Sequence, residues 1–463
     1  MKHILTGFCF VIICMACDRY GSARHSEISF SSDTVYFDTV FTTIGSVTHE
    51  FRAINHNKAP VLLDRIYLGG GSSSPFRLNI NGKPGNEADD IVIPSGDSIF
   101  IFVDVNIDPG DKNNPVAIYD SVVFVSGTNM PKVILEAWGQ DIWLLKDSVI
   151  SGNVWNDEKP YVIYGSLTVD TSQVLRMEAN TKVYFHHNAS MTVAGSLITS
   201  GNETQPVIIA SDRITSEYED VPGQWWGINF LDCSRNNKLS GAIIRNAVTG
   251  VTLKDGPEGN PDIQIIDSKI MHNSVGSVYA SGASLFSVNS VFAHTGFSTV
   301  SVNGIGEYRF IHCTVENIWE YDFRTVPSFY VGKDNGVLPS VMIVNSVITG
   351  SRDNEMSVDA SPAEVDERIT ADSSMIKLNP SSNSWWNSNS FIEVNLTGKP
   401  LFIDESNYDF RPDTLSPLID NAGRRESIDW PYDIRRKPRP TGKGCDIGAY
   451  ERQPGEKRKR TDN

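Results

Sequence analysis

Two pairs of adjacent tryptophans are the residues whose chemistry stands out first, Trp225-Trp226 and Trp385-Trp386. Flat indole rings exposed beside polar side chains are suited to stacking on sugar rings, so all four residues are candidates for glycan contact. The competing interpretation is structural. Neighbouring strand residues face opposite sides, so one ring of "PGQWWGINF" would point inward and one outward, while "SNSWWNSN" would lie as a lid against the end of the fold.

Histidines and acids do not form an obvious catalytic or metal-binding motif. His186-His187 would face opposite sides of a strand and cannot easily chelate one ion. A group of charged residues falls in a turn rich in Gly and Pro, where a solvated loop is expected: Lys254, Asp255, Glu258 and Asp262. The fragment "HTG" at His294 to Gly296 is a weak match to catalytic histidine motifs. The sequence therefore predicts no catalytic residue, metal or other cofactor.

The N-terminus has the features of an export signal. Lys2 and His3 precede the short apolar run Ile4 to Ala16, which is shorter than the roughly 18 residues a membrane span needs. Met15-Ala16-Cys17 resembles the end of a bacterial lipobox, with Cys14 where Leu is usual. The resemblance implies cleavage after residue 16 and a lipid on Cys17, with residues 17–26 as a polar tether.

The remaining cysteines and the charge balance exclude several classes of protein. Cys233, Cys313 and Cys445 are an odd number without CxxC spacing, so neither a disulfide framework nor a zinc site is indicated. A net charge of −16 opposes binding to nucleic acid. The basic run Lys457 to Arg460 is interpreted as a solvated tail.

Residues 27–142 alternate apolar and polar side chains in eight short runs separated by turns. This pattern predicts an antiparallel, immunoglobulin-like β-sandwich. The segments "FDTVFTTIGSVTHEFRAINHNKAPVLLDRI" and "DSIFIFVDVNIDP" resemble the ASH-type Ig domains of Bacteroidota lipoproteins. The predicted core includes Phe51, Ile66, Phe76, Ile101, Val103 and Phe124.

A repeat begins after residue 142. Apolar runs end on the polar-small pairs Arg245-Asn246, Asp267-Ser268, Asn289-Ser290, His312-Cys313 and Asn345-Ser346, at intervals of 22, 22, 23 and 33 residues. A period in the low twenties with no room for a helix predicts a right-handed parallel β-helix over residues 143–350. The long fourth interval predicts an extended loop within Trp319 to Leu338.

Stacked coils require apolar ladders inside and polar residues at the turns. The expected inner ladder includes Ile265, Val288, Phe310 and Ile343. The polar row is expected to stack coil upon coil and bind the bent backbone rather than form a catalytic row: Asp267, Asn289, His312 and Asn345.

The segment from residue 351 to 463 is less regular. Ser361-Pro362-Ala363-Glu364 has the pattern of a helix start with a capping box. "KPLFIDESNYDFRPDTLSPLIDNAG" and "DIRRKPRPTGKGCDIGAYE" resemble the C-terminal, choice-of-anchor Q-like segment of bacterial β-helix proteins. We expect this segment to cap the last coil, because a bare end would expose apolar side chains and unpaired strand edges.

The combined interpretation is a lipid-anchored, all-β protein of the outer membrane, on its cell-surface or periplasmic face. Right-handed β-helices include pectin- and alginate-modifying enzymes, but the NTD, DD and GHG strings of polygalacturonases do not occur here. The first hypothesis is therefore a non-catalytic module that binds a polysaccharide or a surface protein. The alternative is a polysaccharide lyase or glycoside hydrolase, which three or more acids with a basic residue on one coil face would favour.

Overall fold

The computed structural model describes residues 27–110, 115–256, 259–383, 385, 391–392, 394 and 399–457. The chain divides into two compact units, Met1–Asp141 and Ile142–Asn463. The division lies one residue before the one expected from the sequence. Within the described part of the chain, no helix has both the length and the apolar character needed to cross a membrane.

The first unit consists of two β-sheets that share one apolar core. One sheet has the order β1 (Ser29–Phe30), β3 (His49–Ile54), β8 (Ser98–Val105), β5 (Phe76–Ile80) and β6 (Lys83–Pro84). The other has the order β2 (Thr34–Phe41), β10 (Lys132–Gln140), β9 (Val116–Val125), β4 (Val61–Leu68) and β7 (Glu87–Ile93), and η1 (Gly71–Ser73) lies in a connection. All six predicted core residues are buried.

Two features of this unit differ from the expectation. β2 and β10 pair in parallel, so the second sheet is not wholly antiparallel. β7 was not predicted, because it carries Asp89 and Asp90 and most of its residues are exposed or half-buried. It is an edge strand that pairs only with β4 among the described strands, and such a strand tolerates charge.

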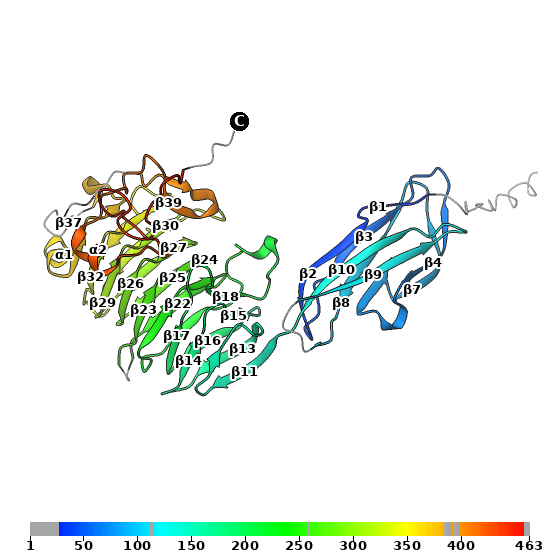
Figure 1. Cartoon of the computed structure of the whole chain (residues 1–463), viewed down its shortest axis with the longest axis horizontal. Coiled ribbons are helices and arrows are strands. Elements are labelled where there is room, and N and C mark those ends of the chain that lie inside the picture. The colour runs from blue at the N-terminus through cyan, green and yellow to red at the C-terminus, as the bar shows by residue number, and fades with distance from the viewer. Residues whose placement is uncertain are drawn as a thin grey trace, which may run out of the picture. The chain divides into compact units, whose positions relative to one another are not determined.

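The second unit is a parallel β-helix, all of whose coil-to-coil strand pairs are parallel (Figure 1). In the described residues, its strands form one sheet of 17 and one of 10. The first sheet contains β11 (Trp143–Ile150), β13 (Tyr161–Val169), β15 (Lys182–Phe185), β16 (Ser190–Val193), β18 (Val207–Ser211), β19 (Ile228–Phe230), β21 (Ala242–Arg245), β22 (Thr249–Lys254), β24 (Lys269–Asn273), β25 (Gly276–Ser281), β27 (Val291–Thr295), β28 (Val300–Asn303), β30 (Thr314–Asn317), β31 (Phe329–Gly332), β33 (Val347–Gly350), β34 (Met356–Val358) and β36 (Met375–Ile376). The second contains β12 (Val154–Trp155), β14 (Val174–Met177), β17 (Ser196–Thr199), β20 (Asn237–Ser240), β23 (Asp262–Ile266), β26 (Ser284–Val288), β29 (Glu307–Ile311), β32 (Ser340–Val344), β35 (Ile369–Asp372) and β37 (Phe391–Ile392).

The inner ladder of the second sheet confirms three of the four predicted positions. Ile265, Phe310 and Ile343 lie in the solenoid core. Val288 was wrong by one residue, because Ser287 pairs with both Ile265 and Phe310 and occupies the inward position. Val288 is buried in a separate, outward cluster with Ile266 and Ile311, against which Trp430 packs. Because the small Ser287 takes the inward position, the inward and outward residues at this end of β26 are the reverse of those expected from the sequence.

The polar row at the turn is confirmed as structural. Its four members have left-handed φ angles of 48° to 52°. Within the row, Asn289 Nδ2 donates to Asp267 Oδ1 at 3.1 Å, and Asn345 Nδ2 lies 3.1 Å from His312 Nε2. Asn and Asp tolerate this conformation. Their backbone partners are not in the bent turn, as expected, but in the C-terminal segment: Asn289 Nδ2 donates to the Tyr432 carbonyl and Asn345 Nδ2 to the Gly423 carbonyl.

The solenoid continues beyond Gly350, where its end was expected. β33 pairs with β36, and β35 pairs with β37. The predicted helix is present as α1 (Pro362–Arg368), with Ser361 as its N-cap and a capping box to Glu364. η2 (Ser216–Tyr218) and η3 (Pro380–Ser382) are short turns in connections between the coils.

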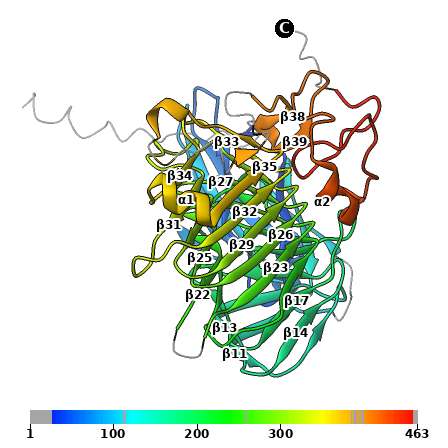
Figure 2. The ribbon, with the colours of Figure 1, turned by 90° about the vertical axis from the view of Figure 1, so that its left-hand side faces the viewer.

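The last segment is not an end cap but a lateral cover (Figure 2). It contains β38 (Phe402–Asp404), η4 (Glu405–Asn407), β39 (Asp409–Pro412) and α2 (Arg424–Asp429). Its side chains pack on outward-facing apolar residues of successive coils, among them Met271, Val291 and Val347. These outward residues would otherwise be exposed, so the cover is needed along the coils and not only at their end.

Candidate functional site

The predicted glycan-binding tryptophans differ in how far they are exposed to solvent. Trp225 is buried in the core, stacks on Phe185 at a centroid distance of 4.2 Å, and donates from Nε1 to the Arg245 carbonyl at 2.9 Å. Trp226 is 57% exposed. Trp385 is buried in the solenoid core, so Trp225 and Trp385 were wrong as glycan contacts. Trp386 and the predicted lipid site Cys17 lie outside the described residues.

A pair of buried histidines lies on neighbouring coils, of which the sequence singled out only His294, in the weak HTG match. His272 in β24 and His294 in β27 are 3% and 2% exposed, and their Nδ1 atoms are 2.7 Å apart. On the other side of the ring, His272 Nε2 lies 3.2 Å from Asp220 Oδ1 in the connection after η2. The three residues form a continuous chain of polar contacts from a half-exposed carboxylate to a buried imidazole.

Their environment keeps both histidines neutral. Burial, followed by the neighbouring His294 and Arg245, lowers the pKa of His272 to about 3. Burial lowers the pKa of His294 to about 4. A neutral imidazole has one donor and one acceptor nitrogen, so the contacts assign the tautomers. His272 donates from Nε2 to Asp220 and accepts at Nδ1 from His294, which leaves a lone pair on His294 Nε2.

A buried carboxyl group lies on the next strand. Glu316 in β30 is paired in register with Ala293, the residue before His294, and is 1% exposed. Burial, followed by Glu405 and Glu355, raises the pKa of Glu316 well above its ordinary value. Burial therefore disfavours the charged form of this side chain.

Both groups have an unused polar atom. Within the described part of the chain, neither His294 Nε2 nor Glu316 Oε1 has a hydrogen-bond partner, although both atoms are buried. Buried polar atoms without partners are costly and uncommon in proteins. Both atoms are available for a hydrogen bond to a water molecule or a ligand.

Aromatic side chains from two distant segments surround the histidines. The Tyr408 ring is 4.4 Å from that of His272 and 5.2 Å from that of His294. Trp319 belongs to the predicted long insertion. Its ring centroid lies 5.1 Å from that of His294 and 4.9 Å from that of Tyr321. We define the acid–histidine cluster as Asp220, His272, His294, Glu316, Trp319, Tyr321 and Tyr408.

The cluster is acidic. Burial raises the pKa of Tyr408, and the nearby Asp220, Glu320 and Glu316 raise it further. The cation next to Asp220 is Arg245, whose Nη1 is already paired with Glu219 at 2.6 Å. An anionic ligand would meet like charge here.

An exposed apolar row runs beside the cluster along one edge of the coils. Phe297 donates its backbone N–H to Val275, Val275 donates to Val248, and Val248 donates to Trp225, the buried residue before Trp226. Trp226, Val275 and Phe297 are 57%, 43% and 52% exposed, and we call these three the aromatic edge. Coils are about 4.8 Å apart, so the edge extends over about 14 Å.

The aromatic edge and the acid–histidine cluster are contiguous. Gly296 lies between His294 and Phe297, and a Cβ placed on it would be 3.0 Å from Trp319 Cζ2. The exposed rings of Tyr321 (58%) and Phe323 (96%) belong to the same insertion as Trp319. The site therefore combines exposed flat rings with a buried acid and a buried base.

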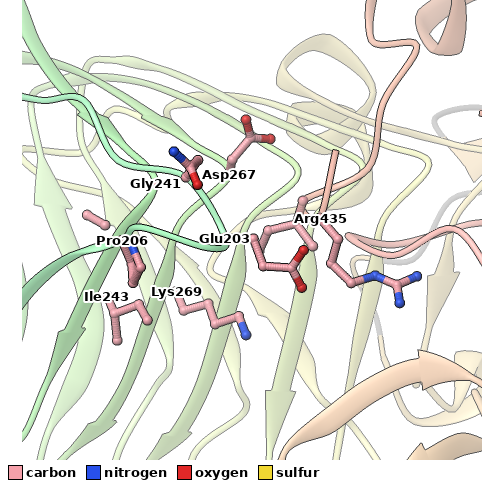
Figure 3. Close-up of a pocket in the computed structure, with 10 residues that line it drawn as sticks. Glu203, Pro206, Gly241, Ile243, Asp267, Lys269 and Arg435 are labelled. Carbon is pink, nitrogen blue, oxygen red and sulfur yellow. The ribbon is translucent and has the colours of Figure 1, made fainter. Parts of the chain in front are cut away.

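A small pocket elsewhere on the solenoid is a weaker candidate (Figure 3). Glu203, Lys269, Asp267 and Arg435 lie around it. Asp267 pairs with Arg436 at 2.9 Å, and Arg435 pairs with Asp433 and Glu456. Because these charges are largely satisfied within the protein, the pocket offers little to a ligand.

His186, which was considered from the sequence, is engaged within the protein, whereas Glu258 lies outside the described residues. His186 Nδ1 lies 2.7 Å from Asp212 Oδ2, and its ring stacks on Tyr164 at 4.0 Å. Among the described residues, no group of three or more His, Cys, Asp or Glu side chains could hold a metal ion. His272 and His294 are 22 residues apart, which is the coil period, and this spacing was the signal that could have found them.

Comparison with known proteins adds little. No family model and no curated protein matches the chain. A family 123 glycoside hydrolase from Clostridium perfringens matches with a TM-score of 0.18 and 9% identity over 26% of this chain and 30% of its own. The catalytic domain of a GH87 α-1,3-glucanase, in complex with nigerose, matches with a TM-score of 0.16 and 8% identity over 76% of this chain and 88% of its own. At these TM-scores neither similarity supports an argument about the site.

Proposed function

We propose that the β-helix binds a neutral polysaccharide along the aromatic edge and into the acid–histidine cluster. The observation that carries this proposal is the row of exposed Trp226, Val275 and Phe297 on stacked coils, contiguous with buried polar atoms that lack partners. The two flat rings of Trp226 and Phe297, with the apolar Val275 between them, suit an extended sugar chain, because they offer stacking at a fixed spacing without an ordering cost on the protein side.

The charges of the site favour a neutral glycan over a polyuronate. Asp220 and Glu320 lie near Tyr408, and the net charge of the whole chain is −16. A uronate carboxylate would need a cation to compensate its desolvation, and Arg245 is already engaged with Glu219. This argument disfavours the lyase alternative for uronate substrates.

The anchoring and the first unit belong to the same proposal. The lipobox-like Met15-Ala16-Cys17 supports a lipid on Cys17 and a place in the bacterial outer membrane, on its surface or periplasmic face. We also propose that the first unit, whose two sheets share one core, is an immunoglobulin-like domain that serves as a spacer. A Cys17→Ser protein is expected to leave the membrane fraction, whereas retention there would contradict lipid anchoring.

Affinity electrophoresis of the full chain in gels containing neutral or acidic polysaccharides tests the binding function. Neutral glycans should retard the protein and polyuronates should not. Trp226→Ala and Phe297→Ala should each weaken retention by about tenfold, the equivalent of about 1.4 kcal/mol. Tyr119→Ala is the matched control, because Tyr119 is 62% exposed on the first unit and should have no effect. Equal retention of all three variants would contradict the proposal.

A further inference from the structure

We propose that the first unit binds a basic segment of a partner protein on the outer face of its second sheet, with an arginine side chain on the Glu136 carboxylate between Tyr36 and Tyr119. This inference does not rest on the proposed glycan binding, which involves the second unit. It gives the first unit a recognition role in addition to its proposed role as a spacer.

Three neighbouring strands place two exposed tyrosines on either side of one carboxylate. β2, β10 and β9 lie side by side in this order (Figure 1). Glu136 in β10 is in register with Tyr36 in β2 and with Tyr119 in β9. Strands are about 4.8 Å apart, so the two tyrosines are separated by about 9.6 Å at the backbone, with Glu136 midway. Tyr36 and Tyr119 are 52% and 62% exposed, whereas the alternate residues Phe37 and Leu135 are buried in the core.

The Glu136 carboxylate has one oxygen that faces solvent. Trp138 Nε1 donates to Glu136 Oε1 at 3.2 Å, and the Tyr119 hydroxyl donates to the same oxygen at 3.4 Å. Glu136 Oε2 accepts no hydrogen bond from the described residues, and it is not one of their buried polar atoms without a partner. A donor from a binding partner can therefore reach Oε2 from solvent.

The charge of Glu136 is not compensated by a cation. Both of its side-chain donors are neutral, and no Lys or Arg of the described residues forms an ion pair with it. Lys132 lies four residues away along β10, which is about 14 Å. Asp38, an exposed residue of the β2 bulge beside Trp138, adds a second negative charge nearby. The face is therefore complementary to a cation.

An arginine matches both the rings and the carboxylate. Its planar guanidinium stacks on aromatic rings and donates to carboxylate oxygens, and the faces of tyrosine rings attract cations. A neutral sugar can stack on the same rings, but it would cover the Glu136 carboxylate without compensating the charge. Tyr, Trp and Arg are also the residues that contribute most to protein–protein interfaces. We therefore favour a basic segment of a protein over a glycan as the occupant.

Biolayer interferometry with the full chain and a short blocked peptide of alternating glycine and arginine tests the inference. The control peptide carries citrulline, the neutral analogue of arginine, and should bind at least about fivefold more weakly at low salt. Glu136→Gln keeps the shape of the side chain and removes its charge, so it should weaken binding of the arginine peptide by about fivefold, and Tyr36→Ala should have a similar effect. Glu50→Gln is the matched control, because Glu50 is exposed on β3 of the other sheet and should have no effect.

Each outcome supports or overturns the inference. Equal binding of the arginine and citrulline peptides, or binding of neither, would overturn it. Equal losses for Glu136→Gln and Glu50→Gln would also overturn it, because the net charge of the protein would then account for binding. A loss of retention by Tyr36→Ala in gels containing neutral polysaccharides would show that this face binds glycan instead. Unchanged melting temperatures of the variants ensure that the losses report on the face and not on folding.

Discussion

Replacement of Arg324 by methionine should destabilise the β-helix strongly, because this residue forms a buried ion pair. The side chains of Arg324 and Glu355 are 1% and 0% exposed. Arg324 Nη2 and Nη1 donate to the two carboxylate oxygens of Glu355 at 2.5 and 2.8 Å. The guanidinium also donates to the carbonyls of Asn317 and Val326, both at 2.8 Å. Arg324→Met removes these four donors at once.

The magnitude follows from what remains after the change. A buried carboxylate without its cation costs about 3–5 kcal/mol. Glu355 would keep the backbone N–H groups of Ser328 and Arg352 at 2.9 and 2.7 Å, which places the expected loss toward the lower end of that range. Arg324→Met with Glu355→Gln should recover part of the loss, because the double variant no longer buries an unpaired charge.

Equilibrium denaturation provides the measurement, and the first unit offers a matched control. Arg65 and Glu87 form an ion pair whose side chains are 49% and 61% exposed. Arg65→Met should leave the free energy of unfolding nearly unchanged, since exposed pairs are worth little. Equal losses for Arg65→Met and Arg324→Met would refute the argument that burial decides the cost.

Three further predictions follow from the packing and the pKa shifts. Phe310→Ala should reduce the free energy of unfolding by about 3–5 kcal/mol, measured by denaturation, because it empties a core position. Val288→Asp should place its charge under Trp430 and release the lateral cover, so limited proteolysis should cut residues 400–457 while the coils stay intact; loss of the coils would contradict this. Burial raises the pKa of Glu451 to about 7, so folding favours its protonated form and stability should fall as the pH rises from about 4.5 to about 7. Glu451→Gln should weaken this pH dependence in thermal melts at several pH values.

The solenoid could be predicted because its determinants are local and repeated. The polar-small pairs mark one turn in each coil, and their left-handed backbone explains why Asn, Asp and His recur there. The register of β26 could not be predicted in the same way, because Ser287 occupies an inward position and Val288 an outward one. The lateral cover decides which side chains of β26 point outward, because it provides an apolar partner for the outer face of this strand.

The acid–histidine cluster could be predicted only in part. The spacing of His272 and His294 equals the coil period and places both on one face once the coils are known. Nothing local indicates that Glu316 is buried or that Asp220 reaches His272. The tryptophan pairs were misleading for a related reason, since large apolar rings are as useful in a solenoid core as on its surface.

The lateral cover forms part of the acid–histidine cluster together with the coils. Phe402 and Phe410 pack with Met271 and Ala293, the residues that precede the two histidines. This packing places the intervening η4 turn over β24 and β27, and Tyr408, with a left-handed φ of 56°, brings its ring against both imidazoles. The apolar contacts that hide the outer faces of the coils thus also exclude water from the histidines. Exclusion of water is the cause of their lowered pKa values, so the C-terminal segment contributes to the chemistry of the site as well as to its stability.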